Sequence, residues 1–553
     1  MIEREVNIYP NLEFRSRDPI PGRNEMRKSA RFVLAFVLTV PLLPSGAGAQ
    51  EPAGKPLTLN DCVIQAVRKN LGVAVQVVNT RLADISVSRA GEKFIPSLQF
   101  EFGDQNQNSP SYSWTDAADG VQSAYRNYDA GLSQSLPFGG SLSFSLTGYK
   151  SDSNSRFQTI NPRFGSTMNF SFTQPLLKDF GWGTSRKDIL VARNNREAAE
   201  NDLKGTLLDL VDRVEQAYWE LVYSLESLQV RRQSLSLAED LLDKSRKEIS
   251  IGTLAPKEVL SAQAEVASRK ADILQAVQQV KDNSDVLRNL INLPGDSTDA
   301  DLLPTDRPTL VRNDLSLDDA LASAMKNRPD LQSSGLAVKN KELDLSFARN
   351  QTLPSLNLTA NYWSPGVSGD RILYLDNNPL TGVIIGTLPG GASAALQDAF
   401  GFKYRNWSVS LSLQIPLNTV FSRATEAQAR TLMEQEIARM KNQEQGVVFE
   451  IRAAVRAVRT NYERVDAYKA ARELAEQKLE AEQAKMKAGM SSNFMVLQYQ
   501  RDLASTRTME LRALIDFRRA LGRLEKAMGT GLDKWNIKLT DAFSSSGSTP
   551  EGE

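Results

Sequence analysis

The chain has 553 residues with 66 basic and 66 acidic side chains, so its charge is balanced and gives no reason to expect a nucleic-acid partner. It contains no histidine, which removes the commonest general base and the commonest metal ligand. A single cysteine, Cys62, excludes disulfides within the chain and metal sites built from several cysteines. We therefore expect no catalytic residue, no metal site and no cofactor, and we expect Cys62 to lie in the core of a helix.

Residues 1–49 are interpreted as an N-terminal extension followed by a cleaved signal peptide. Arg27, Lys28 and Arg31 precede an apolar segment over residues 32–43, and small residues follow at 47–49. A membrane anchor is the alternative, but about a dozen apolar residues are too few to span a bilayer comfortably. No run of about 18 apolar residues follows, so we expect no transmembrane helix.

The segment from 187 to 251 predicts one very long helix. It has no proline, its only glycine is Gly205, and at about 1.5 Å per residue it would extend roughly 100 Å. Apolar residues spaced alternately three and four apart form a stripe typical of coiled coils. The stripe comprises Val211, Val214, Tyr218, Leu221, Leu225 and Leu228, and it recurs as Val448, Ile451, Val455, Val458, Tyr462 and Val465. We expect each stripe to pack against its duplicate and against neighbouring subunits.

The duplication extends through most of the chain. Leu-x-Leu openings at 57–61 and 315–319 correspond, as do Pro-Ser-Leu segments at 96–98 and 354–356. We infer a first repeat at 57–293, a linker at 294–314, a second repeat at 315–530 and a flexible tail at 531–553. The predicted short helices are 58–69, 73–93, 317–326 and 331–350; the long ones are 187–251 and 421–487, with return helices at 256–293 and 492–521.

Between the short and long helices, apolar and polar residues alternate with the period of a β-strand. The predicted strands are 98–102, 128–136, 142–146, 168–173, 356–362 and 407–415, with a turn at 137–140. The polar positions are mainly Ser, Thr, Asn and Gln, and aromatic residues lie near strand ends, which favours a water-lined membrane barrel. A soluble sandwich with one face on a core is the alternative.

Together these features resemble the TolC-type outer-membrane efflux factor family over about residues 57–530. The resemblance depends on the paired Leu-x-Leu openings, the paired Pro-Ser-Leu strand starts, and Gln174-Pro175-Leu176 at the end of the first strand region. It also depends on glycine-centred turns at 251–254 and 488–491. Their order, duplication and spacing, rather than any single motif, identify the family.

The resemblance implies an α+β membrane protein that forms a homotrimer with two tandem repeats per chain. A β-barrel shared by the subunits would contact outer-membrane lipid and continue into a long periplasmic α-helical barrel. Such a channel passively conducts substrates in tripartite efflux or type I secretion, docked through a periplasmic adaptor, or membrane fusion protein, to a proton-driven or ATP-driven inner-membrane pump. The alternative function is a periplasmic coiled-coil adaptor or scaffold, which would lack the paired serine-rich strands.

The family's usual plan has two strands per repeat and twelve in the trimer, whereas the first repeat here shows four alternating segments. The sequence is compatible with one lengthened hairpin or with additional strands.

The resemblance also implies functional positions at the two turns between long helices. Six residues would form the periplasmic tip and the adaptor contact: Gly252, Thr253, Leu254, Gly489, Met490 and Ser491. Alternatively, the two glycines serve only to end the helices, in the left-handed backbone conformation that glycine adopts easily. The entrance positions fall on Glu258, Met495 and Gln498. Met495 and Gln498 are uncharged, unlike the acidic residues common at these positions in the family. Glu258 could simply be a favourable charge in the first turn of a helix.

Overall fold

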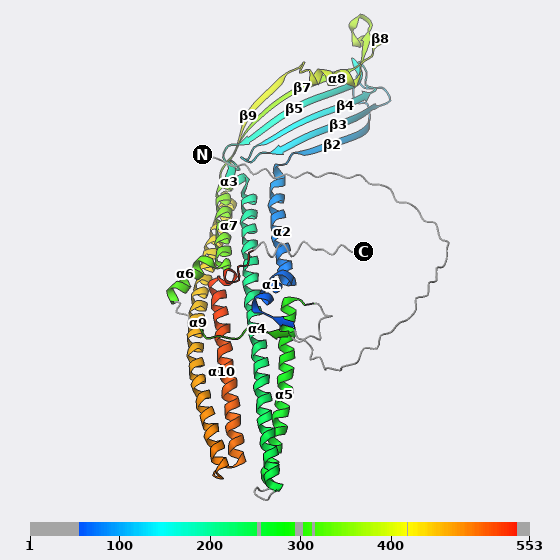
Figure 1. Ribbon diagram of the computed structural model, residues 1–553. Helices are drawn as coiled ribbons and strands as arrows, with labels where there is room; N and C mark the ends of the chain where they lie inside the picture. Colours follow the sequence, from blue (N-terminus) through cyan, green and yellow to red (C-terminus); the bar gives the residue numbers. More distant parts are fainter. Residues whose placement is uncertain (1–54, 251–255, 294–301, 312–315, 417–418, 539–553) are drawn as a thin grey trace, which may run out of the picture. The chain divides into compact units, whose positions relative to one another are not determined.

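The computed structural model describes residues 55–250, 256–293, 302–311, 316–416 and 419–538 (Figure 1). The predicted signal peptide, with the rest of residues 1–49, lies outside the described residues. None of the helices in the described part of the chain combines the length and apolar character that crossing a membrane requires.

The predicted long helices are confirmed. They are α4 (Lys187–Ser250) and α9 (Thr419–Lys487), with return helices α5 (Pro256–Ile291) and α10 (Asn493–Met528). They lie side by side in the order α5, α4, α10, α9 (Figure 1). The shorter helices are α1 (Leu59–Lys69), α2 (Leu71–Gly91), α3 (Trp182–Ser185), α6 (Leu317–Asn327), α7 (Pro329–Gln351), α8 (Ala392–Phe400) and α11 (Gly531–Lys534), with 3₁₀ turns at 92–94, 375–377 and 379–381.

The residues of the two apolar stripes are buried or half-buried, but in separate cores. The α4 stripe packs with α1, α2 and α5, and the fully buried Cys62 of α1 lies in this core as predicted. The α9 stripe packs with α6. The prediction that the stripes pack against each other is wrong within the chain, because α10 lies between them. Ile515 of α10 is buried in the first core and Phe517 in the second, so the return helix uses two apolar faces.

Six long strands form one continuous sheet, so the prediction of alternating strands is confirmed. They are β2 (Ser97–Ser109), β3 (Val121–Ser135), β4 (Ser141–Ser153), β5 (Ile160–Pro175), β7 (Ser355–Tyr374) and β9 (Asn406–Gln414). Their order is β2-β3-β4-β5-β7-β9, and every neighbouring pair is antiparallel. The soluble-sandwich alternative is wrong, because the other sheet among the described strands is a single pair of three-residue strands, too small to cover this one.

The predicted turn between the middle strands is present at residues 136–140. Leu136 and Gly140 are joined by a 2.7 Å backbone hydrogen bond, and Gly139 has a φ of +99°. A Cβ at Gly139 would approach the carbonyl oxygen of Asp179 to 2.2 Å, so the turn requires glycine there.

Two small additions were not predicted. The short strand β8 (Ile384–Leu388) pairs with the far end of β7, and α8 packs against β5 and β7 (Figure 1). Between the repeats, β6 (Leu302–Pro304) pairs in parallel with β1 (Lys55–Leu57). Within the segment expected to be a tail, residues 531–538 include α11 and Trp535, which packs against the α4 core.

Candidate functional site

In the half of the sheet nearer the helices, one face is built mainly from apolar side chains. Because paired residues in an antiparallel sheet point to the same face, the register aligns apolar side chains into rows that run across the strands. One row crosses all six long strands: Leu98, Leu132, Phe144, Phe170, Tyr362 and Trp407. The ring centroids of Phe144 and Phe170 are 4.9 Å apart within it.

The opposite face carries a matching polar row, in which each residue is the immediate chain neighbour of one residue in the apolar row. It consists of Ser97, Ser133, Ser143, Ser171, Asn361 and Ser408. The hydroxyl oxygens of Ser97 and Ser133 are 2.7 Å apart, and Asn361 donates a 3.3 Å hydrogen bond to Ser408 Oγ. The sheet therefore separates a hydrogen-bonding surface from an apolar one along its whole width.

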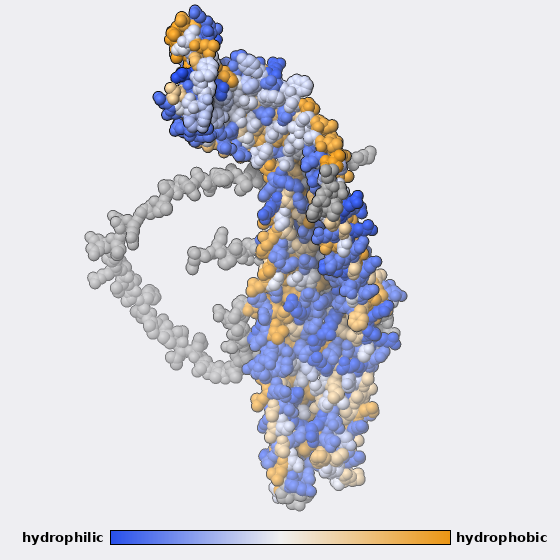
Figure 2. Space-filling view, turned by 180° about the vertical axis from the view of Figure 1, so that it is seen from behind, coloured by the Kyte–Doolittle hydropathy of each residue, from blue (hydrophilic) through white to orange (hydrophobic). Residues whose placement is uncertain are grey.

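The apolar face is open rather than buried in a core. Phe100 is 74% exposed, Trp407 73% and Leu411 63%. A contiguous apolar surface of this kind marks contact with a membrane or another protein. In the rear view of Figure 2, the broad part of the sheet is mainly hydrophilic or intermediate (blue and white). Hydrophobic residues (orange) are concentrated along the β9 edge and at the β8 end.

Helix α8 covers one end of the apolar face. The hydroxyl of Ser166 on β5 donates a 2.6 Å hydrogen bond to the carbonyl oxygen of Ala395 on α8, and Ala395 and Ala399 are almost fully buried. A Cβ at Gly366 of β7 would approach the same carbonyl oxygen to 2.0 Å. The small residues Ser166 and Gly366 therefore allow the helix to lie directly on the sheet.

The second predicted tip is a tight helix end. Gly489 has a φ of +73°; its N–H donates to Met486 C=O, and the Met490 N–H donates to Lys485 C=O. These two bonds are the Schellman pattern that ends helices at glycine. Met490 then projects into solvent with 73% of its surface exposed.

Ser491 closes the tip from the other side. Its hydroxyl donates a 2.5 Å hydrogen bond to Glu482 Oε1, and Lys485 pairs with the same carboxylate at 3.2 Å. These interactions lower the pKa of Glu482, with the Ser491 hydrogen bond as the largest cause. The residues of the first predicted tip, Gly252, Thr253 and Leu254, lie outside the described residues.

The predicted entrance residues occupy the first two turns of the return helices. Glu258 on α5 and Met495 on α10 are half-buried, and Gln498 on α10 is exposed. The two hairpins pack together close to their tips through a shared apolar cluster that includes Leu241 of α4 and Val496 of α10. Asn493 also donates a buried 2.7 Å hydrogen bond to Ser245 Oγ, so the tip of one hairpin positions the other.

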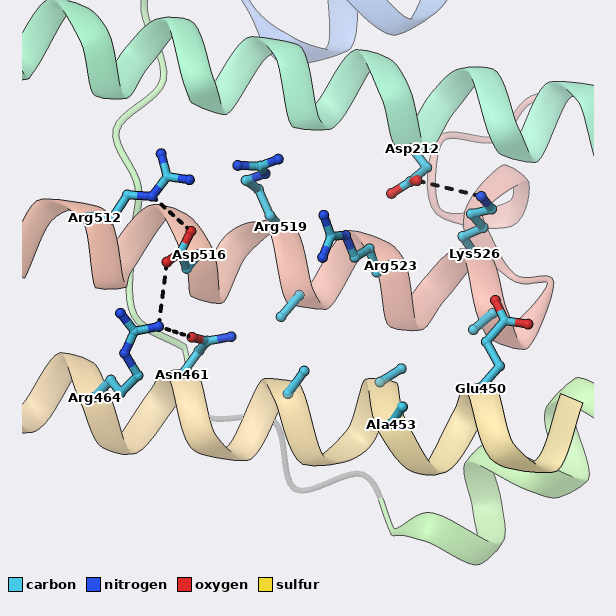
Figure 3. A pocket seen from close by; sticks show the side chains of 14 residues that line it. Asp212, Glu450, Ala453, Asn461, Arg464, Arg512, Asp516, Arg519, Arg523 and Lys526 are labelled. Carbon is cyan, nitrogen blue, oxygen red and sulfur yellow. Dashed lines mark hydrogen bonds and ion pairs between the residues drawn. The ribbon is translucent and has the colours of Figure 1, made fainter. Parts of the chain in front are cut away.

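Sequence reasoning missed a charged cavity of about 680 Å³ along α10, between α9 and α4 (Figure 3). Arg512, Arg519 and Arg523 recur seven and four residues apart, a helical spacing that could have indicated one basic face. Glu220 of α4 accepts 2.7 Å bonds from both Arg512 and Arg519. Asp516 pairs with Arg512 at 3.1 Å and with Arg464 of α9 at 3.5 Å. The arginines thus link α4, α9 and α10. The cavity remains open because the α9 side chains that face it are mainly small alanines.

The comparisons with known proteins agree with this architecture. The sequence profile described as outer membrane efflux protein matches residues 140–293 and 320–530. A comparison with curated proteins finds no match.

Three of the solved structures similar to this fold are outer-membrane proteins. The CmeC outer membrane channel of Campylobacter jejuni matches with a TM-score of 0.61 and 15% identity, covering 91% of this chain and 98% of that one. The open state of the Neisseria gonorrhoeae MtrE outer membrane channel matches at 0.59 with 18% identity, over 86% and 89%. The outer membrane protein VceC of Vibrio cholerae matches at 0.59 with 15% identity, over 86% and 96%. At these identities the similarity concerns the fold.

Proposed function

Because the chain belongs to the outer membrane efflux protein family, we propose that it is the outer-membrane channel of a tripartite efflux or type I secretion system. It conducts substrates passively across the outer membrane and the periplasm. The energy comes from an inner-membrane pump, proton-driven or ATP-driven, to which a periplasmic adaptor connects it. The side chains on the polar face of the sheet are uncharged in most positions.

The observation that carries this proposal is the two-faced sheet. The exposed apolar face suits outer-membrane lipid, and the Ser- and Asn-rich face suits a water-filled lumen. A single sheet of six long strands has two open edges, which the membrane interior does not tolerate. Three chains that share one barrel remove these edges, so the proposal includes a homotrimer.

The helices supply the periplasmic part. Helix α4 has 64 residues, and at 1.5 Å per residue it extends on the order of 100 Å. We place the four long helices of each chain in an α-helical barrel below the sheet, with two tandem repeats at 57–293 and 315–530 joined by 294–314. Residues 1–49 would direct secretion and be removed.

The helix tips are the proposed adaptor contact and entrance. Met490 supports this assignment because it is a large apolar side chain held in solvent by a rigid glycine turn. Gly489 and Ser491 shape that turn, and Gly252, Thr253 and Leu254 are proposed for the same role in the first hairpin. Glu258, Met495 and Gln498 follow the tips and are proposed to line the entrance.

Membrane fractionation tests the proposal against a periplasmic adaptor. The expected result is an outer-membrane protein, extracted only by detergent, that migrates as an oligomer and becomes monomeric on boiling. Recovery in the soluble periplasmic fraction, or in the inner membrane, would contradict the channel assignment.

A further inference from the structure

We propose that each chain contributes six strands to the barrel wall, so that three chains form an eighteen-stranded barrel in which β9 of one copy pairs with β2 of the next. This inference rests on the proposed trimeric channel and adds the number of strands and the identity of the two edges that meet. The strand count follows from the hairpin β3–β4, which is part of the sheet.

The β3–β4 hairpin is bonded on both sides. Strand β3 pairs with β2 along all 13 residues of β2, from Ser97 opposite Ser133 to Ser109 opposite Val121. Strand β4 pairs with β5 from Ser141 opposite Thr173 to Ser151 opposite Arg163, with no register shift. Removing the hairpin from the wall would break both ladders, so β3 and β4 belong to the wall, and β2 at the end of the strand order is its free edge.

The seventh strand of the sheet does not add to the wall. Strand β8 pairs only with residues 371–374 of β7, whereas β9 pairs with residues 355–363 on the same side of β7. Strands β8 and β9 therefore share one position in the strand order, next to β7, and β8 does not widen the sheet. This leaves β2 and β9 as the two edges along the part of the sheet next to the helices.

The directions of these edges allow closure. Strand β2 begins just after α2 and leads away from the helices, and β9 leads back to α9. With an even number of alternating strands, β9 of one copy and β2 of the next are antiparallel, like every other neighbouring pair. No described element bonds to the outer edge of β2 or β9, so these backbone groups need a partner in the membrane.

The side chains at the two edges also match. The apolar row that crosses the sheet ends in Leu98 on β2 and Trp407 on β9, and the polar row ends in Ser97 and Ser408. A β9–β2 contact therefore continues the apolar surface with apolar residues and the polar surface with polar ones. A second copy of this chain is therefore the partner whose edge strand matches both faces of the sheet.

The two extra strands, β3 and β4, are connected along the chain to other strands and not to a helix. They are joined at the helix end of the sheet by the turn at 136–140, which rests on the segment that includes α3. The Gly181 N–H donates a 3.1 Å hydrogen bond to Phe138 C=O, and the rings of Phe138 and Trp182 are 6.0 Å apart. Barrel diameter grows about linearly with strand number, so eighteen strands make a barrel roughly 1.5 times as wide as twelve.

Disulfide cross-linking between cysteine pairs tests which strand forms the edge. In a Cys62→Ala background, one cysteine replaces Leu98 on β2. The second cysteine replaces Val409, Leu411 or Leu413 on β9, which gives three variants. Five strand spacings separate β2 and β9 within a chain, on the order of 24 Å, and a disulfide needs Cα atoms within about 7 Å. Any bond between these positions therefore joins two copies. The matched control pairs the same β9 positions with Leu142→Cys on β4.

Covalent trimers on a non-reducing gel with Leu98→Cys, at roughly tenfold the yield of the Leu142→Cys control, are the expected result. Cross-links from β9 to Leu142→Cys instead would contradict the six-strand wall while leaving the shared barrel intact. Absence of cross-links from every β2 and β4 position would contradict the shared barrel, and with it the proposed function. The same gel therefore distinguishes an error in the strand number from an error in the proposed shared barrel.

Discussion

The hydroxyl of Tyr218 lies 2.7 Å from the carboxylate of Asp306, a residue between the two repeats. The same Asp306 carboxylate accepts a 2.7 Å hydrogen bond from the Leu59 N–H, and Tyr218 is fully buried. Burial, followed by the hydrogen bond to Asp306, raises the pKa of Tyr218 well above its usual value, so the phenol stays protonated and able to donate. One side chain of the long helix thus connects α4 to the start of α1 and to the segment between the repeats.

Replacing this tyrosine tests the connection. Tyr218→Phe keeps the ring in the core but leaves the Asp306 carboxylate with one donor fewer, and we expect a loss of about 1–3 kcal/mol in the free energy of unfolding. Thermal unfolding of the detergent-solubilised protein measures it. The control Tyr112→Phe changes a tyrosine that is 85% exposed and should leave the transition unchanged. Equal transitions for the two variants would contradict the assigned role.

Stability should depend on pH through Asp330. Burial raises the pKa of Asp330, but the hydrogen bond and charge of Arg328, 2.8 Å away, outweigh it and hold the pKa below the usual value of 3.8. The unfolded chain therefore binds this proton more readily, and the stabilisation is present above about pH 3.8 and lost as the pH falls through the lowered pKa.

Asp330→Asn should consequently lower the unfolding temperature at pH 7, and the difference from the unchanged protein should shrink as the pH falls below 3.8. Unfolding curves between pH 3 and pH 7 measure this. Asp240→Asn, at an exposed position of α4, is the control and should leave the unfolding curves unchanged. A constant difference across the range would mean that the charge pair is not its cause.

The glycine at the second helix tip should be needed for its backbone conformation. Gly489→Ala forces a side chain into a φ of +73°, and we expect a cost of about 1–2 kcal/mol together with reduced export. Gly446→Ala is the matched control, because Gly446 lies within α9 with open space around it and should gain about 0.5–1 kcal/mol. Chemical denaturation compares them, and equal effects would show that the tip conformation is unimportant.

The contact role of the tip has its own test. Met490→Glu places a charge on an exposed side chain without removing a packed one, so oligomer formation should be unchanged while export in cells is lost. Ser491→Arg should act in the same way and also remove the hydrogen bond to Glu482. Export at the normal level from both variants would contradict the adaptor-contact assignment.

The two faces of the sheet should respond differently to charge. Leu411→Lys places an ammonium group on the apolar face, where we expect a cost of about 2–4 kcal/mol in the membrane and loss of heat-resistant oligomers. Ser410→Lys places the same group on the adjacent, polar face and should leave assembly intact. Western blots of unboiled outer membranes measure both. The reverse order of effects would mean that the lipid-facing and water-facing sides are interchanged.

Much of this architecture could be predicted from the sequence because periodicity reports directly on burial. Stripes such as Val211, Val214 and Tyr218 predicted the long helices, and alternation such as Leu142, Phe144 and Leu146 predicted β4. Beyond Phe102, however, β2 carries polar residues on both faces, so its continuation to Ser109 depends on backbone pairing with β3 and leaves no pattern.

Tertiary arrangement was the part that periodicity could not supply. The matching apolar stripes of α4 and α9 suggested direct packing. Helix α10 instead presents apolar residues to both stripes and separates them. Likewise, α8 is short and has small residues at Ala395 and Ala399, whose burial depends on the space above Ser166. The arginines along α10 are placed by partners such as Glu220, which is distant in sequence.

Single-channel recording in planar bilayers tests the central claim most directly. Purified heat-resistant oligomers should give discrete conductance steps, and Ser410→Lys should shift their ion selectivity toward anions because its side chain lines the lumen. Ser166→Ala, on the opposite face beneath α8, should not alter selectivity. Well-folded oligomers that give no conductance steps, or steps whose selectivity is the same in Ser410→Lys, would contradict a channel lined by the polar face of this sheet.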